Sequence, residues 1–182
     1  MKGVFSLVLC LFFLVGCSAA KEDMNQALAL RSQIQQANAC TFSLQITADY
    51  GNATYDFAMD CVSDRQGNVT FTVTAPESIS GITGNLANGN GSLTFDDTVL
   101  AIPMLTNEKI TPISAPWLLM RTLRGGCITS CAEGRVTIDD SYADDALTLD
   151  IYLDGTGKPK TVDIYWKNSR ILALKVTSFV LS

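Results

Sequence analysis

Apolar and polar residues alternate along residues 40–61, on both sides of the sequence DYGN. A period of two with a turn signal at its centre predicts a β-hairpin with one buried face. The alternating apolar residues are Phe42, Leu44, Ile46, Tyr55, Phe57 and Met59. We expect all six side chains to face the same hydrophobic core.

Two registers of this hairpin keep its apolar residues on one face. In the first, Cys40 lies opposite Cys61, and a disulfide can close the hairpin. In the second, the turn is centred on Gly51-Asn52, which keeps the faces but offsets the two sulfurs. We expect the first register, because a disulfide that closes a loop of this size stabilises the fold by roughly 3 kcal/mol.

The rest of the chain reads as helices and short strands in a single domain over residues 22–182. Residues 22–38 predict an amphipathic helix, interrupted by Arg31. Pro116 and Gly125 mark the start and end of a second helix over 114–124. The expected strands after the hairpin are 69–75, several short ones within 80–102, 135–139, 146–153, 160–167 and 170–180. An N-terminal helix followed by an antiparallel meander with a helical insertion predicts an α+β fold, mainly antiparallel β, with a curved sheet around the helices.

Residues 1–16 have the features of an export signal. Lys2 is followed by the apolar run VFSLVLCLFFLV, which is too short to span a bilayer as a helix. The run ends in Leu14-Val15-Gly16-Cys17, which resembles the lipobox of bacterial lipoproteins. That resemblance implies cleavage before Cys17, acylation of Cys17, a lipidated spacer at 17–21 and attachment to the extracytoplasmic face of the bacterial cell membrane. The alternative is a plain secretory signal with a coincidental cysteine.

Composition narrows the chemistry that the chain can perform. The formal net charge is −5, and the few Lys and Arg residues are scattered, so we expect no nucleic-acid binding. The chain contains no histidine, which excludes Ser-His and Cys-His nucleophile arrangements and removes the commonest metal ligand. We therefore expect no enzyme activity, cofactor or metal.

Two further motifs have alternative interpretations. Cys127 and Cys131 lie in GGCITSC, where a C-x-x-x-C spacing fits a redox or metal site or a small disulfide that pins a loop. We expect the disulfide, because two thiols without histidine make a poor metal site. TIDDSYADDALTLD gathers carboxylates without the spacing of a calcium loop, so we expect a solvated acidic loop there. These carboxylates are Asp139, Asp140, Asp144, Asp145 and Asp150.

Several segments resemble the LolA/LppX-like superfamily of envelope lipoproteins and lipoprotein carriers. They are ANACTFSLQIT, VTFTVTAPESISGI and YLDGTGKPKTVDIYWKNSRILALKVTSF, and the resemblance spans most of residues 22–181. It implies an open half-barrel whose concave apolar face is covered by helices and can hold acyl chains. It implies no catalytic residue.

The second helix, with Trp117, Leu118, Met120 and Leu123, suits either a lid over a lipid-binding groove or an ordinary core element. The candidate ligand-binding residues are Phe42, Leu44, Phe57, Met59, Phe71, Trp117, Leu118 and Met120. We expect a non-enzymatic, membrane-anchored envelope lipoprotein that binds a lipid or acyl chain between sheet and helix. The alternative is an interaction or sensor module that meets an envelope protein partner, with the half-barrel as scaffold.

Overall fold

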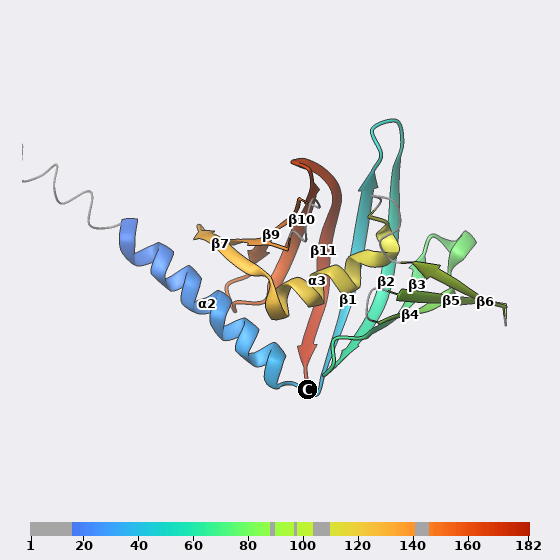
Figure 1. Ribbon diagram of the computed structural model, residues 1–182, viewed down its shortest axis with the longest axis horizontal. Coiled ribbons are helices and arrows are strands. Elements are labelled where there is room, and N and C mark those ends of the chain that lie inside the picture. Colours follow the sequence, from blue (N-terminus) through green and yellow to red (C-terminus); the bar gives the residue numbers. More distant parts are fainter. Residues whose placement is uncertain (1–15, 88–89, 97, 104–109, 141–145) are drawn as a thin grey trace, which may run out of the picture.

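The computed structural model describes residues 16–87, 90–96, 98–103, 110–140 and 146–182. Within these residues the chain forms one antiparallel sheet of eleven strands and two α-helices (Figure 1). The helices are α2 (Gly16–Gln36) and α3 (Ala115–Gly125), with 3₁₀ turns η1 (Glu77–Ile79) and η2 (Pro112–Ser114). The strands are β1 (Ala39–Asp49), β2 (Thr54–Asp64), β3 (Val69–Ala75), β4 (Thr83–Ala87), β5 (Asn90–Phe95), β6 (Thr98–Pro103), β7 (Cys127–Ala132), β8 (Arg135–Asp139), β9 (Leu147–Leu153), β10 (Pro159–Trp166) and β11 (Ser169–Leu181).

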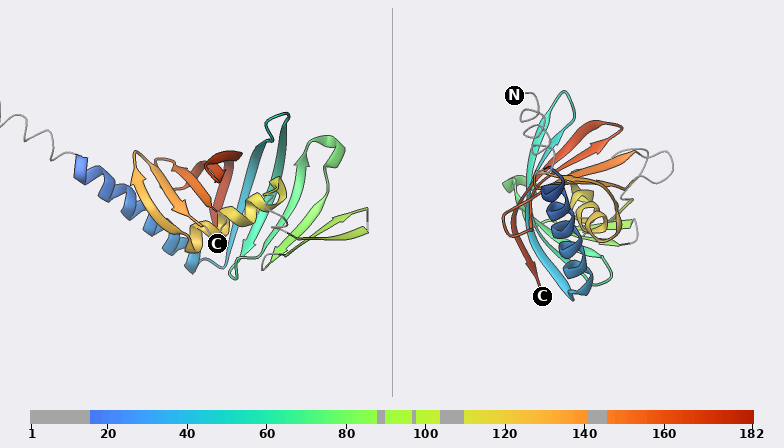
Figure 2. Two further views of the ribbon diagram at one scale, coloured as in Figure 1. Left: turned by 45° about the horizontal axis from the view of Figure 1, so that its top comes forward. Right: turned by 90° about the vertical axis from the view of Figure 1, so that its left-hand side faces the viewer.

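The sheet is open. Its strand order is β6-β5-β4-β3-β2-β1-β11-β10-β9-β8-β7, so β6 and β7 form the two edges. The sheet curves, and both helices lie inside the curve (Figure 2). The predicted α+β half-barrel, mainly antiparallel and with helices on its concave face, is confirmed.

Alternating burial along the strands places the core between the sheet and α3. In β1, Phe42, Leu44 and Ile46 are buried, whereas Thr41 and Gln45 are exposed. Eight residues of α3 are buried, which makes it a central helix rather than a surface one. They are Ala115, Pro116, Trp117, Leu118, Leu119, Met120, Thr122 and Leu123.

The first hairpin adopts the second of its two registers. Phe42 lies opposite Cys61, and Leu44 lies opposite Met59, so the predicted pairing of Cys40 with Cys61 is wrong. The turn explains the difference. The Asp49 carboxylate accepts a hydrogen bond of 2.8 Å from the Gly51 amide, and Gly51 has a φ of +80°, which a glycine adopts without strain. Turn geometry therefore sets the register.

The structure does not support the two predicted disulfides, since Cys40, Cys61, Cys127 and Cys131 are free thiols. In the observed register Cys40 faces Ser63 instead of Cys61. Cys127 and Cys131 lie four residues apart on strand β7, not in a loop. A strand rises about 3.3 Å per residue, so their Cα atoms are much farther apart than the roughly 7 Å that a disulfide can bridge.

Helix α2 begins earlier than predicted. It starts at Gly16, so residues 17–21, expected as a spacer, continue the helix. Most of the remaining boundaries agree with the sequence within about two residues, but β2 extends to Asp64 and β7 was not expected as a strand. The β10–β11 connection is a two-residue turn at Lys167-Asn168, both with positive φ, as a type I′ hairpin requires. Of the described helices, none has the length and hydropathy needed to cross a membrane.

Candidate functional site

The predicted ligand-binding residues form the core under α3. Seven of the eight are buried, and Phe57 is half-buried at the edge of this core. The buried ones are Phe42, Leu44, Met59, Phe71, Trp117, Leu118 and Met120. A cavity between the helices and β7–β9, lined in part by Ala27 and Leu123, has a volume of only about 10 Å³. A space of this size is at the limit for one water molecule and is far too small for an acyl chain. The role of these eight side chains in ligand binding remains a prediction.

Arg31 of α2 holds the C-terminal end of α3. Its Nε donates to the Leu123 carbonyl at 2.9 Å, and a terminal nitrogen donates to the Gly126 carbonyl at 2.7 Å. The Gln35 side chain donates to the Arg124 carbonyl at 2.8 Å. The last carbonyls of a helix have no partner within the helix, so these bonds satisfy groups that would otherwise be orphaned. Arg31 interrupts the apolar stripe of α2 because it caps the neighbouring helix.

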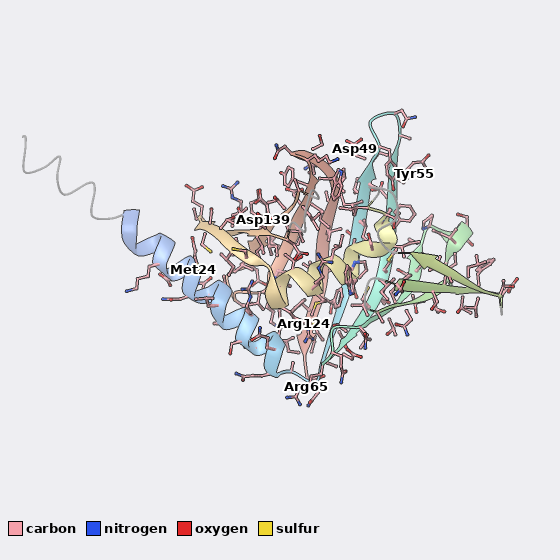
Figure 3. All side chains as sticks on the ribbon, viewed as in Figure 1. Met24, Asp49, Tyr55, Arg65, Arg124 and Asp139 are labelled. Atoms are coloured by element: carbon pink, nitrogen blue, oxygen red, sulfur yellow. The ribbon has the colours of Figure 1, made fainter. Side chains whose placement is uncertain are left out.

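Arg124 ties the same end of α3 to the β2–β3 turn. Its guanidinium donates to the carbonyls of Asp64 and Arg65 at 2.8 and 2.9 Å. Figure 3 shows Arg124 and Arg65 at one end of the sheet. The turn itself is fixed by the Asp64 carboxylate, which accepts hydrogen bonds from the amide and side chain of Asn68. The C-terminal end of α3 is therefore attached to both α2 and the sheet.

Asp140 and Arg121 form an ion pair between β8–β9 and the side of α3. The Arg121 guanidinium contacts one Asp140 oxygen at 2.6 and 2.8 Å and lies over the Trp117 ring at 4.6 Å. The Asp140 side chain is 4% exposed. Burial raises the pKa of its carboxyl, although Arg121 and Thr122 act in the opposite direction. The expected solvated acidic loop is therefore wrong for Asp140, while Asp144 and Asp145 lie outside the described residues.

The concave face continues beyond the part that α3 covers. Cross-strand neighbours share a face of a sheet, and the register places Phe71 opposite Gly84, Gly84 opposite Leu93, and Leu93 opposite Leu100. Phe95 belongs to the same face, two residues after Leu93 on β5. Exposure increases along this row, from a buried Phe71 through a half-buried Leu93 to a Leu100 that is 57% exposed. We call Leu93, Phe95 and Leu100 the open strip.

Gly84 makes this row continuous with the core. A Cβ atom at this position would lie 2.3 Å from the Phe71 ring and 3.1 Å from the Leu93 side chain. The absence of a side chain lets the Phe71 ring cross β4 and approach Leu93. The core and the open strip thus form one apolar surface.

Sequence reasoning did not single out the open strip. The signal was the sequence SLTFDDTVLAI, in which Leu93 and Phe95 alternate with polar residues and an apolar strand follows. The segment predicts only short strands, because nothing in it indicates that β6 is the edge of the sheet or that, among the described residues, no helix covers this edge.

A second hollow, of about 650 Å³, lies on the opposite face of the sheet. Its lining combines hydroxyls and amides from β1–β5 with the exposed Val62, and Asp60 is its charged member. Ser43 donates to the Asp60 carboxylate at 2.7 Å. Within the described residues, no group of three or more His, Cys, Asp or Glu side chains could hold a metal ion. The lining of this hollow is therefore mixed, and its polar side chains interrupt the apolar ones.

No family model and no curated protein matches the chain. Similar solved structures include a LolA superfamily protein from Nitrosomonas europaea, 9% identical over 86% of this chain and 93% of that chain, with a TM-score of 0.42. The lipoprotein LppX from Mycobacterium tuberculosis is 13% identical over 89% and 95% of the two chains, with a TM-score of 0.44. LprF from Mycobacterium bovis is 10% identical over 88% and 94%, with a TM-score of 0.45. These names agree with the LolA/LppX-like superfamily that the sequence resembles. The half-barrel described for this chain is drawn from the strand order and the curvature of its own sheet.

Proposed function

We propose that the chain is a non-enzymatic envelope lipoprotein, anchored through Cys17, that binds an acyl chain on the concave face of its half-barrel. The observation that supports this proposal is the open strip. Leu93, Phe95 and Leu100 extend the core face beyond α3, and Phe95 and Leu100 are at least half exposed. Apolar side chains gathered on one face of a folded domain and left accessible are typical of a binding surface.

This proposal moves the ligand from the place that the sequence suggested. The side chains of α3 and of the strands beneath it are buried against one another, the cavity beside α3 holds only about 10 Å³, and α3 is fixed at its C-terminal end by Arg31 and Arg124. An acyl chain bound to the open strip needs no movement of α3. It would contact Leu93 and Leu100 and approach the Phe71 ring where that ring crosses Gly84.

The experiment compares two variants of the same strand. Leu100 lies on the concave face of β6, and Val99, 65% exposed, lies on the opposite face. We expect Leu100→Gln to weaken the binding of a fluorescent fatty acid to the mature protein about tenfold, as the loss of one buried leucine contact predicts. Val99→Gln should bind as the wild type does. Equal binding by both variants, or no binding by the wild type, would contradict the proposal.

A second candidate function is a protein interaction module that uses the half-barrel as a scaffold. The solid packing under α3 favours it, because a scaffold needs no internal cavity. Native mass spectrometry of protein from its own membranes separates the two. Lipid bound to the wild type and lost in Leu100→Gln supports acyl binding, and a lipid-free wild type supports the scaffold.

A further inference from the structure

Among the described residues, the edge strand β6 is less protected than the other edge of the sheet. Strand β7 carries an irregularity between Ile128 and Ser130, and α2 packs against it. Strand β6 pairs with β5 over its whole length without a register shift, and β5 is its main packing partner among the described residues. Bulges and covering helices are devices that keep an edge strand from pairing with another chain. Within the part of the chain that the structure describes, β7 has both devices and β6 shows neither.

The composition of β6 points in the same direction. The segment Thr98–Pro103 contains no charged residue. Val99 is exposed on one face and Leu100 on the other, so the strand is apolar on both sides. Charged side chains on an edge strand commonly prevent it from pairing with another chain. An apolar edge strand without them is a template for a further strand.

We propose that β6 pairs antiparallel with β6 of a second copy of this chain. The incoming strand must be uncharged, have a free edge and present apolar residues on both faces, and β6 itself meets these conditions. A two-fold axis perpendicular to the sheet keeps the concave faces of both copies on one side. Leu100 then lies opposite Leu100 of the second copy, and Val99 lies opposite its Ala101.

Charge does not oppose this occupant, and the small interface area determines how weak the dimer should be. The chain is acidic, but the acidic residue at the start of the β5–β6 turn, Asp96, falls at opposite ends of an antiparallel pair. A single pair of six-residue strands buries much less than the roughly 1,600 Å² of a typical stable interface. The dimer should therefore be weak in dilute solution. We expect it to form where anchored copies are concentrated in one membrane. This expectation rests on the proposed Cys17 anchor.

The pairing would also complete the proposed binding surface. Each copy ends its concave face at Leu100, and the second copy would continue that face with its own open strip. An acyl chain could then lie across the junction of the two sheets and contact both copies.

Cysteine cross-linking in intact membranes tests the pairing. Directly opposed residues of an antiparallel pair have Cα atoms about 4.5–5.5 Å apart, which a disulfide can bridge. The variant Leu100→Cys is made in a Cys127→Ser background, since Cys127 is exposed. The control is Val180→Cys, because Val180 is 54% exposed but lies on the central strand β11. We expect oxidation to give a covalent dimer with Leu100→Cys and none with Val180→Cys.

Further variants separate this proposal from the proposed function. Adding Val99→Lys to the Leu100→Cys variant should lower the dimer yield at least tenfold, while Val180→Lys should leave it unchanged. Circular dichroism checks that each variant is folded. A correctly anchored protein that gives no dimer overturns the pairing but not the anchor, and a cross-link to a different protein overturns the second copy as the occupant. A wild-type protein that binds no fatty acid, while Leu100→Cys still gives the dimer, contradicts only the proposed function.

Discussion

At the scale of single residues, the structure separates side chains that the sequence presents as alike. Cys40 and Cys61 are buried, and burial raises the pKa of Cys40 to about 12 and also raises that of Cys61, so both are inert core thiols at neutral pH. Cys127 is exposed. Among the carboxylates, Asp140 is buried in an ion pair, whereas Asp163 pairs with Arg170 at the surface.

We expect Asp140→Ala to lower the free energy of unfolding by about 3 kcal/mol, because it removes a buried carboxylate that pairs with Arg121 and accepts a hydrogen bond from the Thr122 hydroxyl. Asp163→Ala removes an exposed pair and should cost no more than about 1 kcal/mol. Urea denaturation of both variants measures the difference. Equal losses would show that the Arg121–Asp140 pair is not the attachment that the structure indicates.

Asp154 predicts a pH dependence. Its carboxylate accepts hydrogen bonds from the Thr156 hydroxyl, the Thr156 amide and the Lys158 amide. The bond from Thr156 is the largest cause that lowers its pKa below the ordinary 3.8. Because folding lowers this pKa, the stabilisation is present above the unfolded value and is lost as the pH falls through the folded value.

Wild type should therefore be more stable than Asp154→Asn at pH 6. The difference should shrink at about pH 3, where the unfolded carboxyl is mostly protonated. Denaturation curves at the two pH values measure it. A difference that is the same at both would contradict the role assigned to this carboxylate.

At the scale of elements, α3 is the part that gives the half-barrel its solid core. Its buried residues fill the concave face, and three side chains from α2 and α3 fix its C-terminal end. Arg31 contributes most of the link to α2. This arrangement predicts that α3 is a fixed element and not a mobile lid.

Arg31→Met keeps the length of the side chain but removes both hydrogen bonds to the α3 carbonyls. Hydrogen bonds that involve a charged group contribute about 1.5–3 kcal/mol, and Arg31 is half-buried, so we expect a loss of about 2 kcal/mol. Amide exchange in the last turn of α3 should become faster. Gln36→Met on the exposed side of α2 is the control and should change neither measurement. An unchanged exchange rate in α3 would show that Arg31 does not hold it.

The elements could be predicted from the sequence, whereas their contacts could not. Alternation along residues 40–61 fixed the buried face of the hairpin, but both registers satisfied it, and the Asp49–Gly51 turn decided between them. Arg31 looked like an interruption because its partners, the α3 carbonyls, lie about 90 residues away in the chain. Asp140 looked like a member of an acidic loop because its burial depends on the docking of α3.

At the scale of the whole molecule, the two ends of the half-barrel differ. Helix α2, about 31 Å long at 1.5 Å per residue, begins near Cys17 and covers the β7 edge, while the open strip and the free β6 edge lie at the far end (Figure 1). Helix α2 runs without a break from Gly16 to Gln36, so the link from Cys17 to the body is helical. An anchor at Cys17 would hold the open strip away from the point of attachment.

The proposed location, the access to a lipid ligand and the pairing between copies all depend on the lipid anchor at Cys17. The chemical state of Cys17 is therefore the most direct test. Intact-mass spectrometry of the mature protein from its native host measures it. We predict a chain that begins at Cys17 and carries a diacylglyceryl group on the Cys17 sulfur. A mature chain with an unmodified thiol at Cys17, or one that begins at another residue, would contradict the account.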